Sequence, residues 1–321
     1  MGKRYRDAEK YAVLAAAYAS DDMREGTKID HSDVGGYRTK TVRAGEYLYI
    51  SCYPLIGCNA NRTQRRMLEE DLAADRKQKA KIRMRYAKYN NKRRIQEMEQ
   101  LVHANFVKGD MHICCTYEKQ DYEQMSQLEY RTREEARKDI RNYIRRVKGL
   151  LKKHNCDLNQ FRWICVTVTK ESDKEAPNPL PDSHHHHMLV HGIPQELRND
   201  VENLWKKGYC NADRLQDSEK GFAAITGYIA RQEGSYNGER PGERSYSTSK
   251  NIIRPKVTTS DNKLSRRRAS MIAADVRIAG NEIFEKLFDG YRLVEQARVD
   301  VSTFVAGAYI YAKMRRKQQR R

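Results

Sequence analysis

Apolar side chains recur along this chain with two different spacings, which predict two kinds of element. Residues 131–154 carry them three and four positions apart, as in an amphipathic helix, and Thr132 with Glu135 forms the capping box expected at its start. Shorter runs are continuous or alternating and rich in β-branched residues, as in the strands of a sheet. These predicted strands cover residues 110–117, 161–169 and 183–191.

Two more helices are predicted after the third strand. Ile193-Pro194 opens the first of them, because proline is favoured in the first turn of a helix. Residues 206–211, KKGYCN, are interpreted as a turn, and the second helix covers residues 219–232. Residues 171–183 contain three prolines and no apolar period, so the strands on either side are expected to pair antiparallel. The order of elements predicts an α+β fold, with an antiparallel central sheet and helices packed on it.

The segments on both sides of these elements are less regular. Residues 11–19 are interpreted as a short helix or peripheral segment, not an export signal, because tyrosines interrupt them and charges precede them. Residues 45–57 predict a hairpin. From Asn61 to Asn105 the pattern is that of one helix, since neither glycine nor proline interrupts it, and its apolar end is expected to dock on a core. The predicted organisation is an N-terminal extension (1–60), a long basic helix (61–104), a central domain (105–255) and a C-terminal α/β extension with a basic tail (256–321).

The charge of the chain points to an acidic partner. The formal net charge is +19, and apolar residues make up 39% of the sequence. Nucleic acid is the expected partner, with an anionic membrane surface as the alternative. No run of apolar residues is long enough to span a membrane. The seven cysteines include no CxxC motif, which indicates a reduced, intracellular protein.

The most concentrated positive charge lies in the predicted long helix. Residues 76–94 contain ten Lys and Arg and no acidic residue. Like charges repel at helical spacing, so such a run favours a polyanion along it, although a solvated helix face is the simpler alternative. The tail at residues 313–321 is expected to bind the same phosphate backbone. The helix residues predicted to contact phosphates are Lys77, Lys79, Lys81, Arg83, Arg85, Lys88, Arg93 and Arg94.

Four consecutive histidines stand at the start of the third predicted strand. Successive residues of a strand point to opposite faces, so His185 and His187 share one face while His184 and His186 share the other. A His-x-His pair on one face places two imidazoles within reach of one metal ion. A purification tag is not indicated, because the run continues into a strand, and a zinc site lacks a cysteine partner or an HExxH motif. His191 is interpreted as structural, and the pattern assigns no role to the second pair.

A tyrosine on the last predicted helix supplies a candidate nucleophile. Metal-assisted cleavage of phosphodiesters suits a basic protein, because the ion polarises the scissile phosphate. Tyr228 would attack that phosphate, and Arg231, one helical turn away, would steady the developing charge. Spacing alone is also compatible with a half-buried helix aromatic.

In their order along the chain, these segments resemble the motifs of HUH-type replication initiators (Rep proteins) of phages, plasmids and mobile elements. Similar features include a strand ending in Thr116-Tyr117, the histidine strand, and a Trp-x-x-Gly segment within residues 204–215. The tyrosine motif at Tyr228 and a Ser-x-Asn element within residues 244–255 follow in the family's order. The resemblance covers residues 60–317.

The resemblance implies an HUH endonuclease domain, with a ferredoxin- or RRM-like sheet, at residues 105–255. It implies that His185 and His187 bind Mg²⁺ or Mn²⁺. Tyr228 would then nick single-stranded origin DNA, leaving a 5′-phosphotyrosine and a free 3′-OH for rolling-circle replication. The sequence has no GxxxxGK[ST] pattern for a helicase of its own, so a host helicase and polymerase in the cytoplasm of a bacterial host are implied as partners.

Two positions depart from the family's pattern. Arg231 replaces the usual lysine, which keeps the charge but excludes release of a proton, so its expected role is electrostatic. Val168 stands where a glutamate often completes the metal site. The third ligand is therefore left open between Glu171, Asp173 and water.

These departures keep several alternatives open. Tyr236 and Tyr246 would each serve as a second tyrosine or as a DNA-stacking residue. A catalytically silent DNA-binding regulator on the same scaffold is the alternative function from a different class. A transposase or relaxase would use the same chemistry, and a zinc-binding regulator would purify with stoichiometric zinc.

Overall fold

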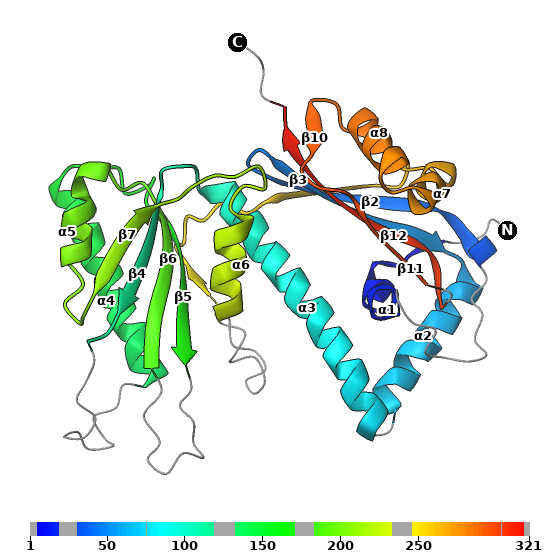
Figure 1. Cartoon of the computed structure of the whole chain (residues 1–321), viewed down its shortest axis with the longest axis horizontal. Coiled ribbons are helices and arrows are strands. Elements are labelled where there is room, and N and C mark those ends of the chain that lie inside the picture. The colour runs from blue at the N-terminus through cyan, green and yellow to red at the C-terminus, as the bar shows by residue number, and fades with distance from the viewer. Residues whose placement is uncertain are drawn as a thin grey trace. The chain divides into compact units, whose positions relative to one another are not determined.

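The computed structural model has an α+β architecture with two antiparallel sheets (Figure 1). It describes residues 5–18, 31–74, 76–118, 132–170, 183–232, 246–302 and 304–317, with the backbone alone at residues 31, 76–78, 170, 231 and 232. The chain divides into two compact units, residues 1–100 with 255–321 and residues 101–254. The predicted fold class is confirmed, and each unit is built on its own sheet.

The first unit contains a seven-stranded antiparallel sheet. Its main path runs β10-β12-β3-β2-β9, and β1 and β11 pair with β3 and β12 respectively. The hairpin predicted around residues 45–57 is present, with Gly45 at a φ of 57° in its turn. Since β12 pairs with β3 from Arg315↔Tyr47 to Ile310↔Cys52, the two ends of the chain build one sheet and not separate extensions. The strands are β1 (Arg6–Asp7), β2 (Val34–Ala44), β3 (Tyr47–Ile56), β9 (Lys256–Ser260), β10 (Tyr291–Leu293), β11 (Arg298–Ser302) and β12 (Val305–Arg316).

Helices from both ends of the chain pack on this sheet. One buried cluster joins the sheet's apolar side chains to those of α1, α2, α7 and α8, including Leu14, Met67, Ile272 and Phe284. The short N-terminal helix is therefore part of a core, which excludes the peripheral alternative. The helices of this unit are α1 (Ala12–Ala17), α2 (Cys58–Ala73), α7 (Arg266–Ala274), α8 (Ile278–Leu287) and most of α3 (Arg76–Asn105), whose last five residues belong to the second unit.

The single helix predicted from Asn61 to Asn105 is wrong, because the chain breaks it into α2 and α3. Ala74 leaves the helical region with a ψ of 160°. The Asp71 carboxylate near the end of α2 accepts hydrogen bonds of 2.8 Å from the hydroxyls of Tyr86 in α3 and Tyr18 after α1. These contacts require the chain to turn, and no local propensity signals them.

The predicted basic tail is also partly structural. Residues 313–316 belong to β12, and Lys313 is buried in an ion pair with Glu99 of α3. Tyr49 donates a hydrogen bond of 3.0 Å to the same Glu99 carboxylate. Residues 318–321 lie outside the described residues.

The second unit is built on a five-stranded antiparallel sheet of order β7-β4-β6-β5-β8. The three predicted strands are confirmed, and β6 lies at the centre between β4 and β5. Residues 210–214, which were expected partly as a turn, form an edge strand. Of its five residues only Ala212 is buried, so the segment has no apolar period to signal it. The strands are β4 (Met111–Thr116), β5 (Arg162–Lys170), β6 (Ser183–His191), β7 (Cys210–Arg214) and β8 (Ser247–Thr248).

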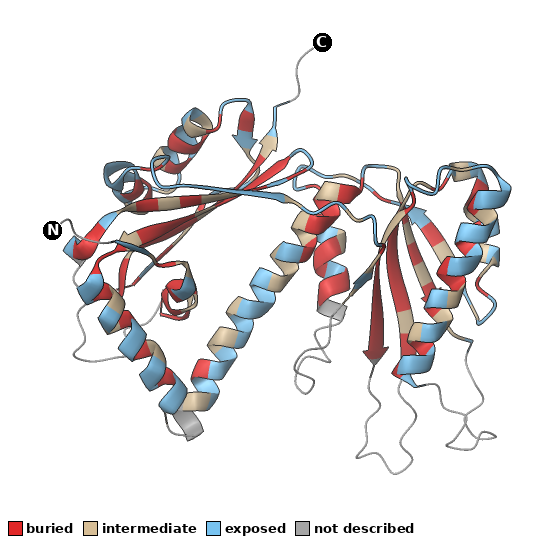
Figure 2. Cartoon of the chain, turned by 180° about the vertical axis from the view of Figure 1, so that it is seen from behind, coloured by how far each residue is buried: buried red, intermediate tan, exposed pale blue. Residues whose placement is uncertain are grey.

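Helix α4 (Arg133–Lys153) covers one face of this sheet (Figure 2). Its predicted capping box is present, and its apolar stripe packs on a cluster that includes Met188 and Val190 of β6. α5 (Arg198–Asn203) adds Val201 to the same cluster. α6 (Ala223–Gln232) begins four residues later than predicted, because Gly221 has a φ of 68° and the Phe222 amide donates instead to His103 Nε2.

Replacing Lys313 by Met tests the buried ion pair of the first unit. The substitution removes the cation that balances the Glu99 carboxylate, so we expect the free energy of unfolding to fall by about 3 kcal/mol. The double variant Lys313→Met/Glu99→Met removes both charges and is expected to recover most of this loss. Urea denaturation followed by far-UV circular dichroism measures both. Equal destabilisation of the single and double variants would contradict the assignment.

Candidate functional site

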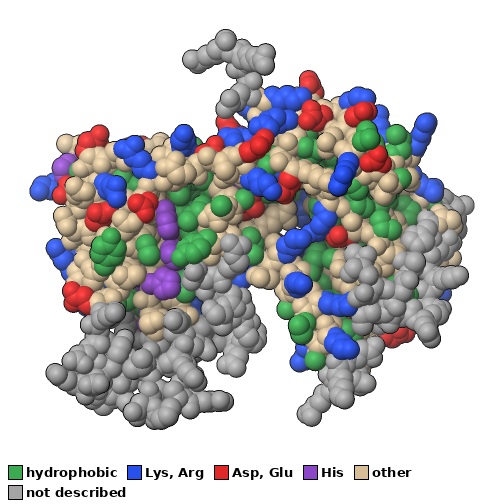
Figure 3. Space-filling model, in the orientation of Figure 1, with side chains coloured by type: hydrophobic (Ala, Val, Ile, Leu, Met, Phe, Trp, Pro, Cys, Tyr) green, Lys and Arg blue, Asp and Glu red, His purple; other side chains and the backbone are tan. Residues whose placement is uncertain are grey.

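Strand β6 distributes its four histidines over two different environments. Met188 and Val190 pack with α4, so the alternating residues His184 and His186 lie on the helix-covered face. His185 and His187 lie on the opposite face, called the open face below. Histidine side chains gather in a column on the side of this unit seen in Figure 3.

The pair on the helix-covered face is satisfied by hydroxyl groups. His186 is fully buried, with Nδ1 3.0 Å from Thr167 Oγ1 and Nε2 3.0 Å from the Tyr117 hydroxyl. Its ring also meets the edge of Trp205. His184 Nδ1 lies 3.0 Å from Thr169 Oγ1. These two histidines, to which the sequence assigned no role, are therefore part of the fold.

The open face brings Tyr228 together with the two predicted metal-binding histidines. The ring centroids of His185 and His187 are 5.1 Å apart, and that of Tyr228 lies 5.5 Å from His187 in an edge-on arrangement. Tyr228 projects from α6, where the next two residues, Ile229 and Ala230, are buried and anchor the helix. Its own side chain is 45% exposed and thus accessible to a large substrate.

A further histidine beside His187, on the neighbouring strand, was not among the predicted site residues. His112 Nε2 of β4 lies 3.1 Å from His187 Nδ1, and the two rings stack with centroids 5.3 Å apart. His187 Nε2 is buried and has no hydrogen-bond partner among the residues that the structure describes. The one available signal was a single imidazole in the otherwise apolar run MHICC. Only the register of β4 against β6 shows that it reaches the candidate site.

Burial keeps these imidazoles neutral. It lowers the pKa of His187 to about 3, and the neighbouring His112 and His185 rings contribute in the same direction. Burial also lowers the pKa of His112 and of His185. Neutral imidazole is the form that binds metal ions, so the open face is prepared to offer nitrogen lone pairs near neutral pH.

The residues present fit a loosely held divalent ion better than a closed structural site. Two nitrogen donors are available, Nε2 of His187 and a ring nitrogen of the neighbouring His185. Among the described residues, no group of three or more His, Cys, Asp or Glu side chains is arranged to hold a metal ion. Val168 is the buried strand partner of His185, so an apolar side chain occupies the position where the resemblance to HUH-type initiators implies a third ligand. Such a set leaves coordination positions open to water or substrate.

Other predicted residues are found outside this group. The backbone of Arg231 belongs to α6, but its side chain lies outside the described residues, as do Glu171, Asp173 and Tyr236. His191 Nδ1 lies 2.9 Å from the Asp110 carboxylate, in line with a structural role.

The predicted phosphate contacts of α3 differ in their availability. Lys81, Arg83 and Lys88 are exposed, and Lys79 is half-buried. Three arginines have contacts within the protein: Arg85 donates to the Ala17 carbonyl, Arg93 pairs with Glu97, and Arg94 donates to Asn91. The side chain of Lys77 lies outside the described residues. Charge counting could not distinguish these groups.

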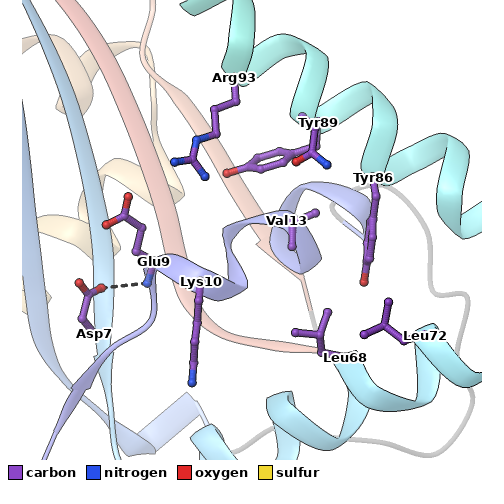
Figure 4. A pocket seen from close by; sticks show the side chains of 10 residues that line it. Asp7, Glu9, Lys10, Val13, Leu68, Leu72, Tyr86, Tyr89 and Arg93 are labelled. Carbon is purple, nitrogen blue, oxygen red and sulfur yellow. Dashed lines mark hydrogen bonds between the residues drawn. The ribbon is translucent and has the colours of Figure 1, made fainter. Parts of the chain in front are cut away.

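A separate recess lies in the first unit between α1, α2 and α3 (Figure 4). Its volume is about 620 Å³, and Tyr86, Tyr89 and Arg93 project into it from α3. Glu9 and Lys10 line it from the N-terminal segment. Acidic and basic groups mix here, so the recess favours no single class of ligand, and none of the predicted catalytic or metal-binding residues lines it.

No family model, curated protein or solved structure matches the chain, so its resemblance to HUH-type initiators remains a prediction. None of the helices in the described ranges is both long and apolar enough to cross a membrane.

Replacing His186 by Leu tests its structural role. The change leaves the half-buried Tyr117 and the buried Thr167 hydroxyls without their imidazole partner, so we expect a loss of about 2–3 kcal/mol in unfolding free energy. Urea denaturation followed by tryptophan fluorescence is the measurement, because both tryptophans, Trp163 and Trp205, lie in this unit. His185→Leu on the open face is the matched control and should cost less than about 1 kcal/mol. Equal losses would refute the division between the two faces.

The lowered pKa of His187 predicts a pH-dependent stability. In the unfolded chain His187 gains a proton as the pH falls through about 6.5, whereas in the folded chain it stays neutral down to about 3. The free energy of unfolding should therefore fall with decreasing pH across this window. In chelator, His187→Gln should reduce the slope by up to about 1.4 kcal/mol per pH unit. Denaturation at several pH values measures it, and unchanged slopes would contradict the assignment.

Proposed function

We propose that this chain is a metal-dependent single-strand DNA endonuclease and strand transferase that initiates rolling-circle replication. The observation that carries the proposal is the meeting of Tyr228 with His187 on the open face, with ring centroids 5.5 Å apart. The buried, unpaired Nε2 of His187 and the adjacent His185 supply donors for an ion at the same place. The order of motifs along the chain adds the resemblance to HUH-type initiators.

The side chains of the open face would hold and orient the reacting groups. His185 and His187 would hold Mg²⁺ or Mn²⁺, and all-nitrogen donors favour Mn²⁺ of the two. When bound, such an ion supplies charge neutralisation at a phosphate oxygen. With Nε2 of His187 occupied, the proton of that ring resides on Nδ1 and is donated to His112 Nε2, which fixes the orientation of the ring.

The proposed step is a transesterification on Tyr228. A bond forms between the Tyr228 hydroxyl oxygen and phosphorus, the bond from phosphorus to the 3′ oxygen breaks, and the phenolic proton ends on that oxygen. The products are a 5′-phosphotyrosine and a free 3′-OH. One phosphodiester replaces another, so the step needs neither an oxidant nor a nucleotide cofactor. The 3′-OH would serve a host polymerase, and a host helicase would open the duplex in the bacterial cytoplasm.

The charge of the chain supports DNA as the substrate. The net charge of +19 and the exposed Lys81, Arg83 and Lys88 of α3 provide contacts to phosphates. Binding through such contacts weakens steeply as salt rises.

One observation favours a second candidate function. Val168 beside His185 leaves the ion with two protein donors among the described residues, which favours a DNA-binding regulator that does not cleave. Such a regulator would bind DNA in the presence of chelator and form no adduct at any metal concentration. A transposase or relaxase would share the adduct and differ only in its DNA.

Covalent capture of DNA tests the proposed function. A pool of single-stranded oligonucleotides labelled at the 3′ end is incubated with the protein and Mn²⁺, and denaturing gels show any adduct. The wild type should form one, and Tyr228→Phe should reduce it by at least about 1000-fold, because the nucleophile is removed.

Tyr5→Phe is the matched control, since it removes the hydroxyl of another exposed tyrosine, in the first unit, and should leave the adduct unchanged. The proposal fails if the wild type forms no adduct with any oligonucleotide of the pool, or if Tyr228→Phe retains it.

A further inference from the structure

The turn that precedes β7, residues 206–209, exposes an aromatic ring and two basic side chains near the candidate site. The Tyr209 side chain is 69% exposed, the largest exposure of any tyrosine in the described ranges. Lys206 and Lys207, three and two residues before it, are also exposed. An aromatic ring held in water carries an unfavourable apolar surface, and a flanking pair of lysines is typical of binding to a nucleic-acid strand.

Hydrogen bonds tie this turn to the end of β4. The Tyr209 carbonyl accepts from the Thr116 amide at 2.8 Å and from Thr116 Oγ1 at 3.3 Å. The Glu118 amide donates to the Lys207 carbonyl, and Trp205 Nε1 donates to the Thr116 carbonyl. The backbone that carries Tyr209 is thereby fixed relative to the strand beside the histidines.

Gly208 makes this close approach possible. Its φ is 147°, and a Cβ added there would lie 2.4 Å from the Glu118 amide nitrogen and 2.6 Å from the Thr116 carbonyl oxygen. No side chain fits at this position, so glycine is required for the turn to lie against the end of β4.

The strand register places Tyr209 in the same row as the candidate site. Cys210 pairs with Cys115, and its thiol lies 3.7 Å from the Tyr143 hydroxyl of α4, on the helix-covered face. By alternation Tyr209 projects to the open face. Thr116, which bonds to Tyr209, is the strand partner of His185. Two strand spacings of about 4.8 Å therefore separate Tyr209 from His185 across the sheet. A strand whose scissile phosphate lies at the histidines could thus place a neighbouring nucleotide against Tyr209.

We propose that residues 206–209 bind the single strand next to the scissile phosphate, with Tyr209 stacking on a base and Lys206 and Lys207 contacting phosphates. This inference rests on the proposed function for its place in the reaction, but the binding itself needs neither metal nor cleavage. Stacking is indifferent to the identity of the base, so this contact positions the strand and leaves the choice of sequence to other groups.

Equilibrium binding in chelator tests the proposal on the full chain. Fluorescence anisotropy with a labelled oligothymidylate of about 20 nucleotides gives the dissociation constant. Tyr209→Ala should weaken binding about 10-fold, whereas Tyr209→Phe, which keeps the ring, should stay within about twofold of the wild type. The pair Lys206→Gln/Lys207→Gln should lower the slope of log affinity against log salt by about 1–2. Tryptophan fluorescence denaturation checks that each variant is folded.

A local readout separates this turn from basic residues elsewhere in the chain. Oligonucleotides with 5-iodouracil at successive positions are irradiated with the protein, and the cross-linked peptide is identified by mass spectrometry. In both the wild type and Tyr228→Phe, the oligonucleotide should cross-link to the peptide that contains Tyr209. Unchanged affinity of Tyr209→Ala together with cross-links only outside residues 205–210 would overturn the proposal. If Tyr209 governs binding but the wild type forms no covalent adduct, the docking site stands and the nuclease function fails.

Discussion

The pairing of β6 between β4 and β5 is the constraint on which the candidate site depends. Both neighbours run antiparallel to it, and their register sets Thr116 and Val168 on either side of His185. A slip of one residue would exchange every side chain of β6 between the two faces of the sheet. The backbone hydrogen bonds that build the core therefore also decide which two of four consecutive histidines reach the open face.

The neighbouring histidines His186 and His187 therefore have opposite hydrogen-bonding environments. His186 has both ring nitrogens within hydrogen-bond distance of hydroxyl groups, so nothing about it remains to be satisfied. His187 is nearly as buried, but its Nε2 has no hydrogen-bond partner within the described part of the chain. Leaving a buried polar atom unpaired costs free energy, and an ordered water, an ion or a substrate group at that nitrogen would remove the cost. The stacked His112 ring, whose Nε2 lies 3.1 Å from His187 Nδ1, holds the His187 ring in the orientation in which its own Nε2 is unpaired among the described residues.

The sequence was informative wherever structure follows from a local period. The central strands and α4 were predictable because their apolar spacing repeats over several residues, and the order of motifs singled out Tyr228 as a candidate beside the histidines. The break after α2 was not, since it depends on tyrosines that converge on Asp71 from two other segments. His112 was missed because its role requires the register between strands that are distant in sequence. In the same way, the count of basic residues could not show that Arg85 caps a carbonyl of α1.

The sheet of the first unit has a consequence for how the chain is made. Residues 101–254 are contiguous, so the second unit has all its strands soon after residue 254 leaves the ribosome. The first 100 residues of the first unit precede it, but they lack β12, the partner of β3, until residue 316 has been synthesised. During that interval the apolar β3, with Leu48 and Ile50, has one unpaired edge, which is the kind of surface that chaperones protect and that aggregates when left exposed. Residues 1–100 therefore leave the ribosome before the second unit but complete their sheet after it.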